Sequence, residues 1–262
     1  MSLFLIIIVS LTASCLTFFS GFGLGTILLP VFALFLPVPM AVAATAVVHA
    51  ANNIFKVGLM WRLADWAIVT RFGLPAIAAA YCGARVLARL ADLPTMYAYH
   101  FLGIAAQMTP LKLLMGLLIL GFALGELHPT LQRLSFKRKY LPLGGMLSGF
   151  FGGLSGHQGA FRSAFLSKVD ITPQAFVGTN AVIGLLVDST RLFVYGTTLS
   201  VFHWERIASS AEGRMILAGA TGAFLGVVIG RRFVHTMTMK TIQHVTGSLL
   251  ILIGALLTMG FI

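Results

Sequence analysis

Long apolar runs separated by short polar connections make up nearly the whole chain. Several are about 20 residues long, the length that an α-helix needs to cross the hydrocarbon core of a membrane. The segments lie at residues 3–19, 24–36, 40–60, 66–90, 96–124, 141–166, 172–196, 211–234 and 240–262. No soluble domain fits between them. The pattern predicts an all-α polytopic membrane protein with about eight transmembrane segments.

The composition agrees with a membrane protein and changes how the charge is interpreted. Hydrophobic residues make up 58% of the 262 residues and charged residues 10%, against about 45–50% and about 25% in soluble domains. The net charge is +11, but many basic residues lie in short connections, where membrane topology and anionic lipid explain them. We therefore expect no nucleic-acid partner. Cys15 and Cys82 lie in apolar segments without a metal-binding or redox motif, so no metal and no cofactor is predicted.

One clearly polar connection divides the chain. The stretch LHPTLQRLSFKRKYLP at 127–142 contains Arg133, Lys137, Arg138 and Lys139, which makes it the best candidate for a cytoplasmic loop. We predict a first transmembrane repeat at 1–126, a basic connecting loop at 127–140 and a second transmembrane repeat at 141–262. The first apolar run lacks a basic region before it, so we expect a retained segment rather than a signal peptide.

The two halves resemble one another at a constant offset. Thr45 and Thr179 are 134 residues apart (179 − 45), and the same offset pairs Gly25 with Gly159. Several matches in order indicate an internal duplication, a common architecture of secondary transporters whose substrate site lies near the interface of the repeats. Whether the repeats are parallel or inverted stays open, as does the absolute orientation.

Glycine-rich stretches interrupt the apolar runs at matching positions, SGFGLG at 20–25 and GGLSGHQG at 152–159. A helix break inside a bilayer is tolerated only where protein or a watery cavity satisfies the freed backbone groups, and an exposed helix N-terminus favours an anion. Each repeat is therefore predicted to begin with a glycine-broken or re-entrant segment that contributes to a substrate site. The site glycines are Gly23, Gly25, Gly156 and Gly159. The alternative is that the glycines only allow close helix packing.

Polar side chains accompany these breaks. Charged residues inside a membrane usually face a cavity or a partner, and helical spacing allows several of them to share one face. The predicted site is completed by His49, Asn52, Asn53, Lys56, His157, Gln158, Arg162, Asn180, Asp188 and Arg191. Asp188 and Arg191, at i and i+3, are equally consistent with a structural ion pair. Arg162, Lys56 and Arg191 would be interfacial anchors instead if they lay at helix ends.

This set is rich in positive charge and hydrogen-bond donors, as a site for a small oxyanion requires. Arginine binds a carboxylate or sulfonate through two parallel hydrogen bonds, and histidine is able to carry a coupling proton. The chain contains no catalytic or nucleotide-binding motif, so we expect no enzyme. Secondary transport of a small anion by alternating access is the favoured function. An anion channel and a non-transporting membrane sensor or assembly subunit are the alternatives.

At these residues the chain resembles the TauE/SafE family of sulfite exporter-like permeases. SGFGLGTILLPVFALFLPVPM looks like the family's first glycine motif, and SGFFGGLSGHQGAFRSAFLSK looks like the second. Many members have three consecutive glycines in these motifs, whereas this chain has Gly23, Leu24 and Gly25, and then His157 and Gln158. The resemblance implies a multi-pass permease of the bacterial inner membrane. Its substrate would be sulfite, a sulfonate such as sulfoacetate, or a related organosulfur anion. Coupling to protons or another ion, and a homo-oligomer, stay open.

Overall fold

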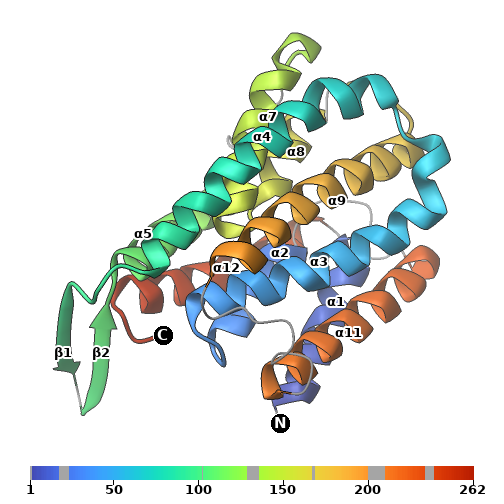
Figure 1. Ribbon diagram of the computed structural model, residues 1–262. Helices are drawn as coiled ribbons and strands as arrows, with labels where there is room; N and C mark the ends of the chain where they lie inside the picture. The colour runs from blue at the N-terminus through green and yellow to red at the C-terminus, as the bar shows by residue number, and fades with distance from the viewer. Residues whose placement is uncertain are drawn as a thin grey trace.

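The computed structural model of the protein describes residues 2–17, 24–101, 103–128, 136–166, 169–199, 210–233 and 239–262. These residues are mostly helical and form one two-stranded sheet (Figure 1). The elements are α1 (Ser2–Thr17), α2 (Leu24–Ala33), α3 (Val38–Met60), η1 (Trp61–Leu63), α4 (Trp66–Ala91), β1 (Tyr97–Phe101), β2 (Ile104–Met108), α5 (Pro110–Leu127), η2 (Arg138–Tyr140), α7 (Leu141–Ser155), α8 (Gln158–Leu166), α9 (Pro173–Thr198), α11 (Ala211–Phe233) and α12 (Met239–Thr258).

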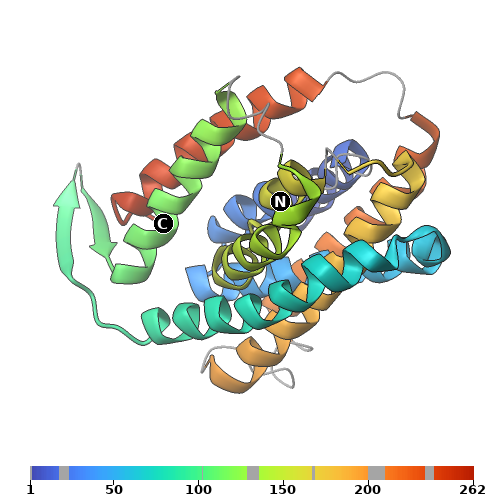
Figure 2. The same cartoon turned by 90° about the horizontal axis from the view of Figure 1, so that it is seen from above.

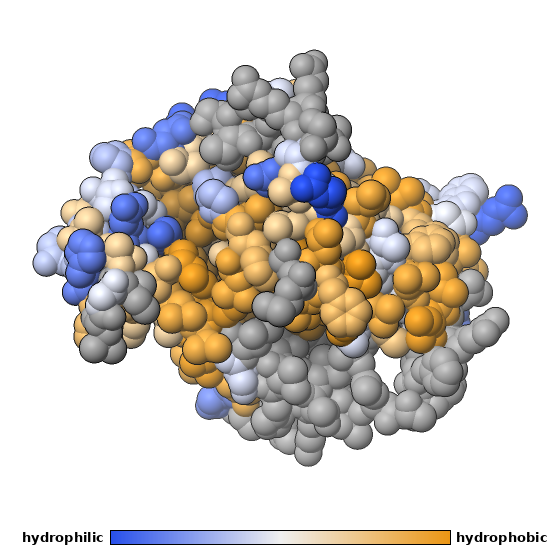
Figure 3. All heavy atoms as spheres, turned by 90° about the horizontal axis from the view of Figure 1, so that it is seen from below, coloured by the Kyte–Doolittle hydropathy of each residue, from blue (hydrophilic) through white to orange (hydrophobic). Residues whose placement is uncertain are grey.

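Four stretches in the described part of the chain are long and apolar enough to cross a membrane. They are Val38–Leu63, Trp66–Ala91, Pro173–Thr198 and Ala211–Gly230. Shorter apolar helices cover Leu3–Cys15, Leu24–Ala33 and Pro110–Gly125. Among the coloured side chains in Figure 3, apolar ones predominate across the middle of the view, and many of the hydrophilic ones lie toward its edges. The chain is therefore a helical, multi-pass membrane protein.

The apolar segment at 96–124 is divided just before Pro110, and its first part is a strand hairpin, so the fold is not purely α-helical. Strands β1 and β2 pair antiparallel, with Tyr97 opposite Met108, and α5 begins only at Pro110. Proline lacks a backbone N–H and suits the first turn of a helix. The side chain of Thr109 caps this helix by accepting from the Lys112 amide at 3.1 Å. Pro110 therefore lies in the first turn of α5, directly after the strand hairpin.

Helices α7 and α8 form a helical hairpin. The break expected in this stretch lies at Gly156, whose φ of +83° is left-handed and ends α7. Helix α8 then folds back along α7. The Ser148 hydroxyl in α7 donates to the Gln158 carbonyl in α8 at 2.7 Å. Nearer the open end of the hairpin, Gly144 lies against the ring of Phe165. The tip of the hairpin is therefore at Gly156.

Helices α1 and α2 also run back along one another. The residues between Thr17 and Leu24, including Gly23, lie outside the described part of the chain. Gly219 of α11 lies against the side chains of both Ile6 and Phe32. Because Ile6 precedes the connection by about as many residues as Phe32 follows it, α2 also folds back along α1.

Glycines spaced four residues apart join each hairpin to a long helix. Gly145, Gly149 and Gly153 of α7 lie directly on the backbone of Phe72, Ala76 and Ala80 of α4. Gly222, Gly226 and Gly230 of α11 lie in the same way on Ile7, Leu11 and Cys15 of α1. Small residues at this spacing let two helix backbones approach closely. In both pairs the residue numbers rise together, so the two helices run in the same direction.

The two central helices run in opposite directions. Asn53 of α3 lies against Gly184 of α9, and Met60, further along α3, lies against Gly178, nearer the start of α9. Helices α5 and α12 are antiparallel as well, since Gly116 contacts Thr258 and Leu127 contacts Gly247. Figure 2 shows this second pair at one side of the other helices. The α3 and α9 pair thus forms the middle of the molecule.

Candidate functional site

Asp188 is the centre of a buried polar network between α3 and α9. Its side chain is fully buried, and both of its oxygens accept hydrogen bonds. Oδ2 accepts from His49 Nδ1 at 2.6 Å and from Asn53 Nδ2 at 2.8 Å. Oδ1 accepts from Gln158 Nε2 at 2.8 Å and forms an ion pair with Arg191 Nη2 at 2.8 Å. Because all these partners are able to donate, they favour the ionised carboxylate.

Gln158 connects this carboxylate to a second group of polar residues. Its amide nitrogen donates to Asp188, while its amide oxygen accepts from Arg162 Nη1 at 3.1 Å. Arg162 Nε in turn donates to Asn180 Oδ1 at 2.5 Å. A continuous chain of hydrogen bonds therefore runs from His49 on α3, through the tip of the second hairpin, to Asn180 on α9.

The buried part of this network carries more positive than negative charge. Lys56 is 7% exposed, Arg162 2% and Arg191 0%. Asp188 is the one buried carboxylate among the residues that the structure describes. These arginines and this lysine are thus inside the protein and not interfacial anchors. Three basic side chains against one acidic side chain leave a net attraction for an anion.

Lys56 and Arg162 belong to facing elements and come close in space. Gly184 of α9 lies against Asn53 Nδ2 and Arg162 Nη1 together, which brings Arg162 to the face of α3 that also bears Lys56. The two cations are near enough to repel one another. Repulsion of this kind is strong in a low-dielectric interior, and an anion placed between the two groups relieves it.

His157 occupies the tip of the second hairpin and is 2% exposed. Its ring stacks on Phe122 of α5, with centroids 4.6 Å apart and planes inclined by 4°. Nδ1 lies 3.1 Å from the Ser155 hydroxyl, while Nε2 is buried and has no hydrogen-bond partner among the described residues. Buried polar atoms are normally paired, so this nitrogen is a candidate to meet a ligand.

Helix α9 also supports the C-terminal end of α7. The Tyr195 hydroxyl donates to the Gly153 carbonyl, and Arg191 Nη1 donates to the Gly152 carbonyl at 3.4 Å. The last carbonyls of a helix lack partners within it and carry partial negative charge. Gly156 has a left-handed φ of +83°, and a Cβ there would also lie 2.9 Å from Arg191 Nη1, so the tip favours glycine. Arg191 therefore has a structural role as well as its ion pair.

The two glycine-rich stretches meet in the middle of the molecule. Gly25, in the first turn of α2, is so close to the second hairpin that a Cβ there would lie 3.2 Å from the Gly156 carbonyl oxygen. The same Cβ would lie 3.8 Å from His49 Cδ2. Gly159 is half-buried in the first turn of α8. Gly23, also expected in the site, is outside the described residues.

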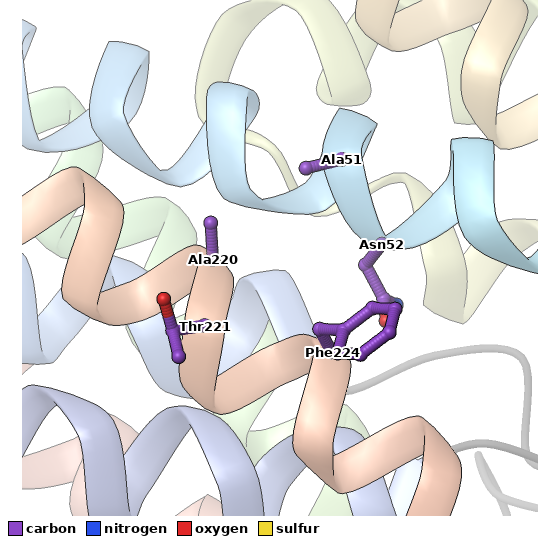
Figure 4. Close-up of a pocket in the computed structure, with 5 residues that line it drawn as sticks. All are labelled: Ala51, Asn52, Ala220, Thr221 and Phe224. Atoms are coloured by element: carbon purple, nitrogen blue, oxygen red, sulfur yellow. The ribbon is translucent and has the colours of Figure 1, made fainter.

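Asn52 points away from the network. It accepts a hydrogen bond from the Ser14 hydroxyl on α1 at 3.2 Å. It also lines a largely apolar cavity of about 320 Å³ between α3 and α11, together with Ala51, Ala220, Thr221 and Phe224 (Figure 4). Successive helical residues point about 100° apart, so Asn53 faces α9 while Asn52 faces α1 and α11. Of the two asparagines, Asn53 joins the acidic centre.

The polar residues predicted from sequence are otherwise brought together around Asp188 and Arg162. Two contributors were missed, Tyr195 and Phe122. Tyr195 follows Arg191 by four residues, so helical spacing places it on the same face and would have revealed it. Phe122 comes from α5, and no local pattern predicts its stacking on His157. In the described part of the chain, no group of three or more His, Cys, Asp or Glu side chains is arranged to hold a metal ion.

The sequence matches the TauE family, described as sulfite exporter TauE/SafE, over residues 6–257. No curated protein and no solved structure matches it. Members of this family are transporters rather than enzymes, in agreement with the lack of catalytic motifs. Because the match covers nearly the whole length, this chain belongs to the TauE/SafE sulfite exporter family of membrane transporters.

Proposed function

We propose that the protein is a secondary transporter of a small anion, either sulfite, a sulfonate such as sulfoacetate, or a related organosulfur anion. The observation that carries this proposal is the excess of positive charge in a buried network at a helix break. Lys56, Arg162 and Arg191 face a single carboxylate among the described buried residues. Buried charge is costly unless it is paired, so an anionic substrate stabilises this arrangement when it binds.

The anion binds near Arg162 and Lys56 at the start of α8. Arg191 pairs with the carboxylate of Asp188 and with the end of α7, whereas Arg162 donates to the neutral amides of Gln158 and Asn180. Because these partners carry no charge, Arg162 is the guanidinium better placed to bind an anion. The amides in the first turn of α8 add a helix N-terminus. His157 Nε2, which has no hydrogen-bond partner in the described part of the chain, lies at the same hairpin tip. Arg162 and Lys56 supply charge, and His157 and Gln158 adjust selectivity.

The two proposed repeats share their helical arrangement, but among the described residues only the second hairpin supplies side chains to the polar network. The offset of 134 maps the first residue of α2, Leu24, onto the first residue of α8, Gln158. It also places Leu28 where the second hairpin has Arg162. The first hairpin therefore contributes backbone and packing, while the second contributes the polar side chains.

We further propose that the repeats, at 1–126 and 141–262, are inverted. Helices α3 and α9 correspond at the constant offset and run antiparallel, as their contacts at Asn53 with Gly184 and Met60 with Gly178 support. Parallel repeats would place corresponding helices in the same direction. Inverted repeats related by an axis in the membrane plane are typical of transporters that work by alternating access.

This arrangement gives eight membrane segments, namely six crossings and two re-entrant hairpins. The crossings are α3, α4, α5, α9, α11 and α12, and the hairpins are α1 with α2 and α7 with α8. Lys137, Arg138 and Lys139 of the connection between the halves then share a face with Arg62. The positive-inside rule makes that face cytoplasmic, in a bacterial inner membrane.

The proposal is tested by a thermal-shift titration of the purified protein with sulfite, sulfate, thiosulfate, sulfoacetate, taurine and simple carboxylates. A ligand that binds the native state raises its apparent stability by mass action. We expect a saturable shift with one class of anion that is lost in Arg162→Ala. The matched control is Arg62→Ala, which removes an exposed arginine at the end of α3 and keeps the shift.

Flux into proteoliposomes separates the alternative functions. Saturable uptake of the anion that gave the shift supports a carrier, and flux that rises linearly with concentration indicates a channel. Binding without any flux indicates a sensor. The absence of both binding and flux for every anion would contradict the proposed function.

A further inference from the structure

His49 lies beside the buried Asp188, between the two central helices, and is slightly more exposed than Asp188. Asp188 is 0% exposed, whereas His49 is 9% exposed. His49 Nδ1 is bonded to Asp188 Oδ2, and the Cδ2 edge of the ring faces Gly25 on α2. Nε2 is bonded to Cδ2, so it lies on the side of the ring away from the carboxylate. Because Nδ1 is bonded to the carboxylate, Nε2 is the ring nitrogen that would bind an additional proton.

Charges of both signs surround this pair. Asp188 favours a positive charge on His49, while Arg191 and Arg162 oppose it. Tyr195, one turn beyond Arg191, also interacts electrostatically with Asp188. An anion bound at Arg162 offsets part of the repulsion between the arginines and a protonated His49, because opposite charges attract strongly in a dry interior. Anion binding and proton uptake at His49 therefore favour one another.

We infer that His49 and Asp188 bind the proton that accompanies the anion, and that Gln158 connects the two events. This inference rests on the proposed function. Gln158 donates to Asp188 with its amide nitrogen and accepts from Arg162 with its amide oxygen. An anion that accepts the hydrogen bond of Arg162 Nη1 removes this donor from the amide oxygen of Gln158. The amide then reorients, which changes the donors around Asp188, so Gln158 acts as a positioning residue.

The cycle balances protons and charge. A proton from solution binds His49 Nε2 as the anion binds Arg162, so a monovalent anion and its proton add no net charge to the site. On the other side of the membrane the anion leaves, and the same nitrogen returns its proton to solution. Anion and proton thus cross in the same direction. By linkage, each tightens the binding of the other by the same factor.

The test is isothermal titration calorimetry of the full-length protein with sulfoacetate and with sulfite. Buffers with different ionisation enthalpies report the protons taken up on binding. Sulfoacetate keeps its charges near neutral pH, and the protonation of sulfite itself is subtracted. We expect uptake of about one proton per anion, with a dissociation constant that rises up to about tenfold per pH unit above the titration range of the histidine.

The variants isolate each residue of the pathway. His49→Asn keeps a donor at the position of Nδ1 but has no titrating nitrogen, so proton uptake and the pH dependence of affinity should disappear. Gln158→Met keeps the length of the side chain and loses both hydrogen bonds, so the pH dependence should flatten. His100→Asn is the control, because His100 is exposed on β1. It should behave as the unmodified protein does.

The possible failures are distinguishable. If sulfoacetate or sulfite binds without proton uptake, the coupling is overturned and the anion site stands. If His49→Asn still takes up a proton, His49 is not the carrier and the inference fails. If neither probe binds at any pH, the proposed function fails and the coupling fails with it.

Discussion

Gly25 and Gly156 bring two distant parts of the chain into contact. A Cβ on Gly25 would lie 3.2 Å from the carbonyl oxygen of Gly156. One glycine begins a helix of the first half, and the other ends a helix of the second half. In the proposed transport mechanism, the substrate binds and the halves move next to this contact, so we expect substitutions here to affect transport before stability.

The first prediction concerns this contact. Gly25→Ala should weaken anion binding several-fold, because Gly25 and the Gly156 carbonyl must separate by a few tenths of an ångström to admit the methyl group. Gly25→Val should abolish binding. Gly58→Ala is the control, since a Cβ there meets nothing within 4 Å. The measurement is the concentration dependence of the anion-induced thermal shift. Unchanged binding in Gly25→Val would show that the contact between Gly25 and Gly156 is not part of the site.

The second prediction concerns the glycines of α7. Gly149→Ala should destabilise the protein by about 1–3 kcal/mol, because its Cβ would overlap the Ala76 carbonyl and force α4 and α7 apart. Gly121→Ala, in α5, should instead stabilise by about 0.5–1 kcal/mol, since it meets nothing within 4 Å and reduces backbone freedom. Thermal unfolding in detergent compares the two. A neutral Gly149→Ala would contradict the close helix contact.

The third prediction separates structural charge from substrate-binding charge. Arg191→Met leaves Asp188 without its ion pair, which should cost about 3–5 kcal/mol of stability. Asp188→Asn in the same chain should recover part of that loss, because the uncompensated charge is gone. Arg162→Met should strongly reduce anion affinity and change the melting temperature only slightly. Equal effects of Arg191→Met and Arg162→Met on both quantities would refute the division of roles.

The fourth prediction concerns membrane topology. With Cys15 and Cys82 replaced by serine, single cysteines are introduced as Arg62→Cys, between α3 and α4, or Ala211→Cys, at the start of α11. Inverted repeats place these corresponding turns on opposite faces of the membrane. An impermeant maleimide added to intact cells should therefore label only one of them. Labelling of both, or of neither until the cells are lysed, would favour parallel repeats.

Lys139→Cys provides a reference for this experiment. It lies in the basic connection between the halves and is exposed. The proposed topology places it on the same face as Arg62, so the two should share one labelling pattern. Different patterns for these two positions would contradict the number of crossings in the first half.

Much of the helical layout follows from the sequence, because crossing a membrane imposes a length and a composition on each helix. Helix α9 was expected at 172–196 and is observed as Pro173–Thr198, with Thr172 capping its start. The β1 and β2 hairpin was not expected. Its aromatic residues extend an apolar run, and hydropathy alone does not distinguish a short strand from the end of a helix.

The site was predictable where its residues share one helix. The spacing of His49 and Asn53, and of Asp188 and Arg191, placed each pair on a face. Which helix each face would meet was not predictable, because the hydrogen bond from His49 to Asp188 joins positions 139 residues apart. Asn52 shows the same limit, since only the packing of α1 and α11 decides which neighbouring asparagine enters the network.

The pairing of α1 with α11 has a consequence for biosynthesis. Helix α1 ends at Thr17, and its most extensive packing partner begins at Ala211, 194 residues later (211 − 17). At about 5–20 residues per second, a ribosome needs roughly 10–40 s to produce that interval. During that time, helix α1 lies in the bilayer or at the translocon without α11 packed against it. Neither half has all its partners without the other, so folding is completed only when synthesis is nearly over.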